Sequence, residues 1–211
     1  MNRNDRRRAR TRQMILEAAD LLYRQKGVEA TTVKEISAEA DVAHGSFYNY
    51  FKSIDDVAAA LTHLAFQRVA SIVTEILDST REVELLPCIG ARVVMRTLLS
   101  DPATRWMIGR PYVFVAECIK VSAPFMEAAE TEAVASGRLK PVDGHQVWIA
   151  TYPWLLLSQL NRALDVEDIG EAEDTFARVS LRFLGVRDDL ADSLIEESRT
   201  LVDRNAAFRR V

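Results

Sequence analysis

The chain has 211 residues, of which 48% are apolar and 27% charged, the balance of an ordinary globular protein. No run approaches the roughly 18 uncharged apolar residues of a membrane span. The arginine-rich start lacks the apolar stretch of a secretory signal, so we expect a cytoplasmic protein with no membrane partner. Two cysteines, Cys88 and Cys118, are too few for a disulfide framework; buried thiols are expected, with a redox switch as the alternative.

The formal net charge of −4 is divided unevenly along the chain. Residues 1–52 hold ten Lys and Arg against seven Asp and Glu, whereas residues 53–211 hold seventeen against twenty-four. Six arginines and one aspartate lie among the first twelve residues. Because phosphate binding depends on local positive charge, this asymmetry predicts a DNA-facing head and an acidic body.

The first part of the chain reads as helices with recognisable ends. Apolar residues at helical spacing predict a first helix over residues 9–26, closed by Gly27 in a left-handed conformation. Thr32 and Glu35 have the spacing of a capping box, which starts a second helix over residues 33–40.

Beyond that helix, Asp41 marks a turn, and a third helix is expected from Ala43 to Tyr50. Ser53 is the expected N-cap of a long helix over residues 53–78. No sustained alternation of apolar and polar residues argues for a sheet. The sequence therefore predicts an all-α fold: a three-helix head with a helix-turn-helix over residues 1–52, and a helical-bundle ligand-binding and dimerisation domain over residues 53–211. The helix over residues 53–78 connects the two.

The third expected helix is unusually polar for its length. His44, Ser46, Tyr48, Asn49 and Tyr50 crowd between apolar neighbours. Hydroxyl and amide groups at this density suit hydrogen bonds to phosphates and base edges. The second element of a helix-turn-helix enters the major groove, so this helix is the candidate reader of DNA.

Residues 11–57 resemble the TetR family of bacterial repressors. The matching pattern runs from Gly27 through Thr31-Thr32-Val33-Lys34-Glu35-Ile36 to Ala40-Asp41-Val42-Ala43-His44-Gly45-Ser46-Phe47-Tyr48-Asn49-Tyr50-Phe51-Lys52-Ser53, without a gap. The resemblance covers under a quarter of the chain, and the remainder is similar only in its all-helical character. It implies a repressor released from a palindromic operator by a small lipophilic or aromatic effector.

The resemblance also implies which residues contact DNA. They would be Thr32, Lys34, Ala43, His44, Gly45, Ser46, Tyr48, Asn49, Tyr50 and Lys52. The N-terminal arginines would lie in or beside the minor groove.

Three positions depart from the family pattern. Asp41 stands in place of the common turn glycine, so we expect a strained but intact turn. Ala43 replaces a frequent serine or threonine, and Ile54 replaces a frequent lysine, which removes a phosphate contact. These departures leave the operator sequence open.

Two late segments, about residues 143–164 and 171–184, are candidates for a homodimer interface. In the family the corresponding helices of two subunits form a four-helix bundle; alternatively, these apolar faces close the core of a single chain. The interface candidates are Val147, Trp154, Leu155, Ser158, Phe176, Val179 and Phe183. Residues 187–205 form a further amphipathic helix without an assigned role.

The middle of the chain, about residues 83–137, is expected to surround a small-molecule cavity. Pro111 and Pro124 would break the helices there and open room between them. At helical spacing, large apolar residues also fit plain core packing. The ligand-binding candidates are Trp106, Met107, Tyr112, Phe114, Glu117, Cys118, Phe125, Trp148, Tyr152 and Gln159.

An enzyme and a helical protein-interaction module are the competing classes. His44, His63 and His145 have no metal-ligand spacing, and no nucleophile or phosphate-binding motif occurs, so we expect no catalytic residue, metal or cofactor. Steep salt dependence of binding to duplex DNA would separate a regulator from both. The effector, the regulated genes and the choice between repression and activation stay open.

Overall fold

The structure is a computed structural model that describes residues 3–80, 82–100, 105–164, 166 and 168–208. The first two residues of the expected N-terminal arm therefore lie outside it. Within this part the chain forms α-helices and one short 3-10 helix, with no strand, which confirms the all-α fold class. The elements are α1 (Arg3–Lys26), α2 (Val33–Glu39), α3 (His44–Phe47), α4 (Ile54–Leu77), η1 (Val83–Leu85), α5 (Leu86–Leu99), α6 (Arg105–Ile108), α7 (Pro111–Ala135), α8 (His145–Ala163), α9 (Gly170–Phe183) and α10 (Asp188–Arg204).

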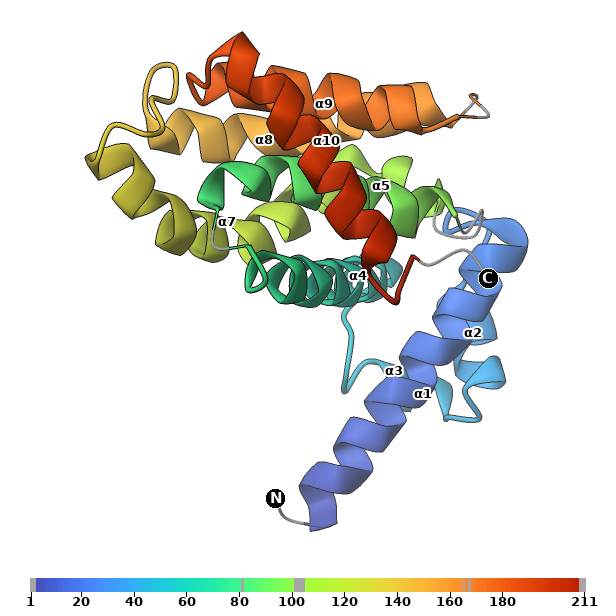
Figure 1. Ribbon diagram of the computed structural model, residues 1–211. Helices are drawn as coiled ribbons and strands as arrows, with labels where there is room; N and C mark the ends of the chain where they lie inside the picture. The colour runs from blue at the N-terminus through green and yellow to red at the C-terminus, as the bar shows by residue number, and fades with distance from the viewer. Residues whose placement is uncertain (1–2, 81, 101–104, 165, 167, 209–211) are drawn as a thin grey trace.

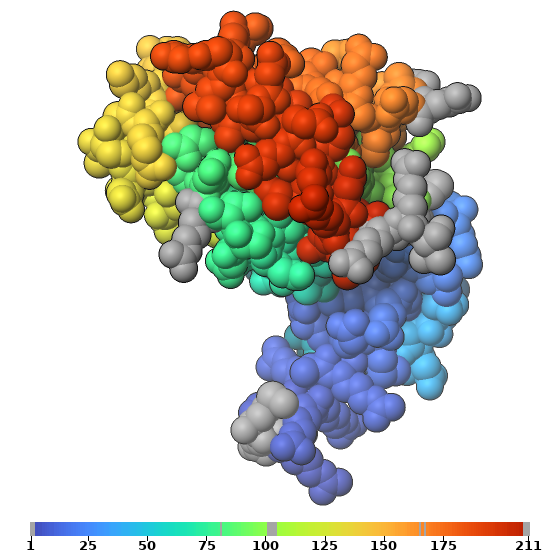
Figure 2. All heavy atoms as spheres, in the orientation of Figure 1, coloured from blue at the N-terminus to red at the C-terminus, as the bar shows by residue number. Residues whose placement is uncertain are grey.

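Helices α1 to α3 and the first turn of α4 form a small head with its own apolar core, which projects from the body (Figures 1 and 2). Its fully enclosed side chains come from all four helices and from the segment after α3. They include Ile15, Leu16, Ala19, Ile36, Phe47, Phe51 and Val57. Each short helix thus contributes one or two apolar anchors, and its polar face stays in solvent.

The body is a bundle in which α4 packs against α5 and α7, and α8 packs against α7 and α9 (Figure 1). By length and composition alone, α4 could cross a membrane. In the structure it instead places Val57 and Ala58 in the head core and Phe66, Val69 and Val73 in the body core. A single rigid helix therefore joins the two cores.

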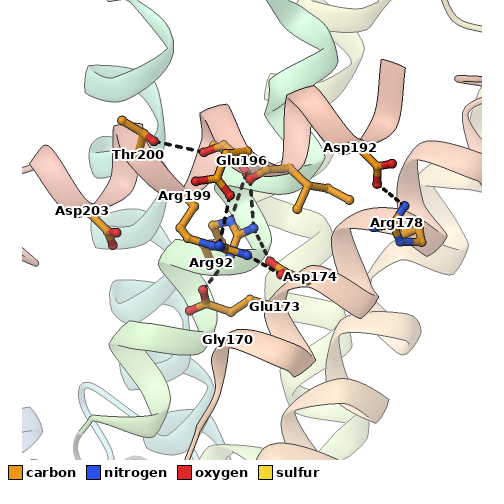
Figure 3. Close-up of polar contacts among 12 residues, drawn as sticks. Arg92, Gly170, Glu173, Asp174, Arg178, Asp192, Glu196, Arg199, Thr200 and Asp203 are labelled. Carbon is orange, nitrogen blue, oxygen red and sulfur yellow. Dashed lines mark hydrogen bonds and ion pairs between the residues drawn. The ribbon is translucent and has the colours of Figure 1, made fainter. Parts of the chain in front are cut away.

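Helix α10, whose role the sequence left open, is fixed to the body by a buried arginine. Arg92 on α5 is fully enclosed, and its guanidinium donates to Glu173 on α9 at 2.8 Å (Figure 3). The same side chain donates to Ser198 Oγ at 3.0 Å and to the Ile195 carbonyl at 3.1 Å, both on α10. This arginine therefore ties three helices together, with Arg96 bonded to the other side of the Glu173 carboxylate.

Two helix ends differ from the sequence-based expectation. Helix α1 begins at Arg3 rather than near residue 9, because arginine is a good helix former and no glycine or proline interrupts the run. Helix α3 ends at Phe47 rather than Tyr50. After it the backbone N–H groups of Asn49 and Tyr50 bond three residues back, so the chain continues as tight turns.

Candidate nucleic-acid interface and ligand cavity

The start of α2 is held by the predicted capping box. The Glu35 backbone N–H donates to Thr32 Oγ1 at 3.3 Å, and the Thr32 N–H donates to the Glu35 carboxylate at 2.9 Å. Hydrogen bonds from Lys26 and Thr32 lower the pKa of Glu35 to about 2. The carboxylate is therefore ionised at neutral pH, close to the positive end of α2.

The turn between α2 and α3 has the geometry expected from its aspartate. Asp41 adopts a left-handed conformation with φ 52°, and the next N–H, of Val42, donates to the Ser37 carbonyl at 2.9 Å. Aspartate tolerates this conformation better than most residues. The predicted intact turn is confirmed, and it sets the direction of α3.

Helix α3 and the turns after it present polar side chains to solvent because Phe47, the last residue of α3, and Phe51 beyond it are buried in the head core. Tyr48 is 53% exposed, and its ring packs edge-on against His44 and Phe47 with centroids 5.6 and 5.4 Å away. The tyrosine hydroxyl is thereby presented on a supported ring rather than on a free side chain.

The ten sequence-predicted DNA contacts are all accessible. Ser46 and Tyr50 are half-buried, and the other eight are exposed: Thr32, Lys34, Ala43, His44, Gly45, Tyr48, Asn49 and Lys52. Such accessibility is what contact with another molecule requires, and it leaves the individual roles as predictions.

A groove of about 660 Å³ runs between the first turns of α1 and the segment around α3. Arg8 on α1 lies over the Tyr50 ring at 5.9 Å and donates to the Asn49 carbonyl at 3.4 Å. Arg12 lies over the Phe51 ring at 5.1 Å. The arginine-rich segment is therefore the exposed first part of α1, and Arg8 and Arg12 contact the residues that follow α3. The sequence-based analysis missed this arrangement because it started the helix too late.

The head meets the body at a polar and aromatic joint. Arg110, at the start of α7, pairs with Asp55 on α4 and with Glu29 in the loop after α1. Trp106 on α6 packs edge-on against Tyr23 on α1 with centroids 5.2 Å apart. Burial raises the pKa of Tyr23, whose hydroxyl donates to the Ile54 carbonyl at 3.2 Å.

An apolar cavity of about 50 Å³ lies inside the body, between α4, α5, α7 and α8. Three of the predicted ligand contacts line it, namely Cys118, Phe125 and Tyr152. Pro124 lies inside α7 beside Phe125. Because proline has no N–H to donate, the helix loses one backbone hydrogen bond at this point.

The other seven ligand candidates lie outside this cavity, and their surroundings explain why. Phe114 and Trp148 are fully buried and pack against Phe66 and Phe183 as plain core. Tyr112 is 79% exposed beside Trp154 on the surface. Trp106 belongs to the joint; the remaining three are Met107, Glu117 and Gln159.

Met107, Glu117 and Gln159 also lie in other environments. Met107 lines a larger open hollow of about 1650 Å³ between the head, α5, α9 and α10, whose lining mixes charged and apolar side chains. Glu117 is buried but bonded to His63 Nδ1 at 3.0 Å and to Lys120. Gln159 accepts a hydrogen bond from Arg162 at 3.4 Å. Spacing alone could not separate core, joint and cavity residues, because all three environments favour large apolar side chains.

The dimer candidates separate into an exposed face and the core of the chain. Val147, Trp154 and Val179 are 42, 44 and 40% exposed, Ser158 is also exposed, and Leu155 and Phe183 are half-buried. The prediction is wrong for Phe176, which is 1% exposed and packs against Tyr152 with ring centroids 5.4 Å apart.

Both cysteines are buried free thiols. Burial raises the pKa of Cys88 and of Cys118 to about 12, so both are protonated at neutral pH. Since the thiolate is the reactive form, this favours plain packing over a redox switch. Within the described residues, no group of three or more acidic, histidine or cysteine side chains could hold a metal ion.

The head also matches known proteins in sequence. Residues 15–61 match the family model described as bacterial regulatory proteins, tetR family. The HTH-type transcriptional repressor KstR2 of Rhodococcus jostii (strain RHA1) is 32% identical over 76 residues, 34% of this chain and 37% of that protein. The chain thus spans little more than a third of the length of this curated relative.

Solved structures share the fold over nearly the whole chain. RolR in complex with its ligand resorcinol has a TM-score of 0.75 and 20% identity, covering 95% of this chain and 97% of RolR. The fatty acid degradation regulator FadR from Bacillus halodurans has a TM-score of 0.60 and 16% identity, covering 81% of this chain and 94% of FadR. KstR2 is described as a transcriptional repressor and FadR as a regulator. The head of this chain is thus similar in sequence to the tetR family of bacterial regulatory proteins, and the chain as a whole shares its all-α fold with these solved structures.

Proposed function

We propose that this protein is a homodimeric, ligand-responsive transcriptional repressor. The observation that carries the proposal is the exposed polar face of residues 43–49, held by buried Phe47 and flanked by the arginines of α1. Exposed hydroxyl, amide and imidazole groups suit base edges and phosphates, and the arginines supply the charge that phosphates require. Residues 1–52 act as the DNA-binding domain, and residues 53–211 as the regulatory domain of a cytoplasmic protein.

Two copies are needed because one short helix offers few contacts to DNA. The outer faces of α8 and α9 supply the pairing surface in our proposal, with Val147, Trp154 and Val179 exposed to solvent on a single chain. Two-fold pairing there would place two heads on a palindromic operator, with recognition helices about 34–36 Å apart.

The apolar cavity is the proposed effector site. Its aromatic and aliphatic lining favours a small lipophilic or aromatic molecule. RolR, which shares the fold, has been solved with resorcinol, a small aromatic molecule. At 20% identity this supports the class of effector, not its identity.

The effector would act through α4 and α7, which both line the cavity and both reach the joint. Val69 and Val73 of α4 and Val121 and Phe125 of α7 face the cavity. At their N-terminal ends the same helices meet through Asp55 and Arg110. A ligand that favours one spacing of these helices would shift the position of the head. The ligand should therefore lower the affinity for the operator, and the operator should lower the affinity for the ligand by the same factor.

The test begins with selection of bound duplexes from a random DNA pool, followed by gel shifts with the selected duplex. The proposal expects a palindromic consensus, two chains per duplex, and weaker binding when a cavity ligand is added. Tyr48→Phe should weaken binding, whereas the exposed body variant Tyr112→Phe should not. Failure to enrich any duplex at low ionic strength would overturn the proposal.

A further inference from the structure

One polar group faces the effector cavity without a partner. Tyr152 on α8 is 5% exposed and lines the cavity, yet no described residue forms a hydrogen bond with its hydroxyl. Its ring packs edge-on against Trp148 and Phe176, with centroids 5.3 and 5.4 Å away. These contacts hold the ring in place, so its hydroxyl is available to a ligand in the cavity.

Gly90 on α5 makes room for this hydroxyl. A Cβ at position 90 would lie 3.0 Å from Tyr152 Oη, closer than such contacts normally come. Glycine also weakens a helix interior relative to alanine. Helix α5 therefore carries glycine, which weakens a helix, at a position where a side chain would crowd the Tyr152 hydroxyl.

The rest of the cavity wall is apolar and uncharged. Among the described residues, the other polar side chains that line it are Cys118 and Ser122, and the Ser122 hydroxyl donates to the Cys118 carbonyl at 2.8 Å. Glu130 stands behind the wall, where its carboxylate bonds His145 Nε2 at 2.6 Å. Burial raises the pKa of Tyr152, so the group is a neutral phenol that can donate a hydrogen bond.

We propose that the cavity selects a neutral, mainly apolar molecule carrying one oxygen that accepts a hydrogen bond from Tyr152, with Gly90 and Tyr152 as the specificity-determining pair. An anionic ligand is disfavoured because, in the part of the chain that the structure describes, no cationic side chain lines the cavity to offset the desolvation of the anion. The volume of about 50 Å³ is well below the roughly 150 Å³ of a cavity known to hold benzene, so a ligand with one ring requires half-buried Phe125 to move. This inference rests on the proposed effector role of the cavity.

Three probes of one ring size test it by isothermal titration calorimetry: m-cresol, toluene and 3-methylbenzoate. One additional hydrogen bond predicts that m-cresol binds roughly fivefold to tenfold more tightly than toluene. The carboxylate should bind most weakly. In Tyr152→Phe the preference for m-cresol over toluene should vanish while toluene affinity is kept. In the control Tyr112→Phe, which alters an exposed tyrosine, the preference should remain.

Gly90→Ala gives a second readout that does not depend on a ligand. In the wild-type background the added methyl group crowds the Tyr152 hydroxyl, so Tm should not rise and m-cresol affinity should fall. In the Tyr152→Phe background that oxygen is absent, and the same alanine should raise Tm. Equal effects in both backgrounds would contradict the pairing of Gly90 with Tyr152.

The proposal is overturned if m-cresol keeps its preference in Tyr152→Phe, if 3-methylbenzoate binds best, or if none of the probes binds. Its failure is distinct from that of the proposed function. If m-cresol binds through Tyr152 but leaves operator affinity unchanged, the cavity assignment holds and the regulatory coupling fails. If another molecule releases the operator while Tyr152→Phe changes nothing, the coupling holds and this inference fails.

Discussion

The head and the body are stabilised by contacts of very different sequence range. In the head, Thr32 caps α2 with Glu35, three residues away. In the body, Arg92 bonds Glu173 and Ser198, which are 81 and 106 residues away. The structure of the head can therefore be predicted from residues close together in the sequence. The structure of the body depends on contacts between residues that only folding brings together.

The largest effect on stability is expected when Arg92, which makes the long-range contacts of the body, is replaced. Arg92→Met leaves the Glu173 carboxylate buried with Arg96 as its remaining partner, so we expect unfolding to become easier by about 3 kcal/mol or more. The control Arg178→Met breaks an exposed pair with Asp192 and should change stability by less than about 0.5 kcal/mol. Urea unfolding measures both, and equal losses would contradict the account.

The local contact in the head, the Thr32 cap of α2, should contribute less to the free energy of unfolding than Arg92 does. Thr32→Ala removes the N-cap of α2 and should destabilise the head by about 1 kcal/mol. In Thr32→Ala, amide hydrogen exchange should become faster in α2 and α3 than in the wild-type protein, with a smaller change in α5 and α9. Thr200→Ala on α10, whose hydroxyl donates to the Glu196 carbonyl and caps no helix, is the control and should leave exchange in the head unchanged. Equal opening in the two variants would count against the capping argument.

The joint between the two regions should matter more for coupling than for stability. Arg110→Gln removes ion pairs to exposed Glu29 and Asp55, each worth about 0.2–1 kcal/mol. We expect the ratio of operator affinities with and without m-cresol to move toward one. Arg138→Gln, which breaks a pair with Glu84 within the body, should keep the ratio. If both variants keep it, Arg110 does not transmit the signal.

The smallest effect on stability is expected at Lys52, whose side chain is exposed. Lys52→Ala should weaken binding to all duplexes alike and lower the slope of log affinity against log salt by about one unit. Lys140→Ala, on the exposed surface of the body, should leave the slope unchanged. An unchanged slope in Lys52→Ala would remove this residue from the predicted contacts.

Much of the head could be predicted because its determinants are local. The capping box, the left-handed Gly27 and Asp41, and the N-cap at Ser53 all occur as the sequence predicts. The end of α3 was misplaced because helical and tight-turn bonding differ only in which carbonyl each N–H reaches. The arginines gave no signal of where the helix containing them would pack.

Less of the body could be predicted, because its site depends on contacts between distant segments. Tyr152 was recognised as a large residue suited to a ligand, but its match with Gly90 is visible only once α5 and α8 lie side by side. Phe176 has the same helical spacing as Val179, and only the packing of α9 decides which faces solvent. The buried partners of Arg92 had no local signal at all.

The central claim is that the polar face around α3 binds duplex DNA as one half of a pair. Fluorescence anisotropy of a selected palindromic duplex, titrated with protein at several salt concentrations, measures this directly. The account predicts two chains per duplex and an affinity that falls steeply with salt, with both features lost in a duplex scrambled at the consensus. Binding of one chain per duplex, or affinity that does not depend on salt, would contradict it.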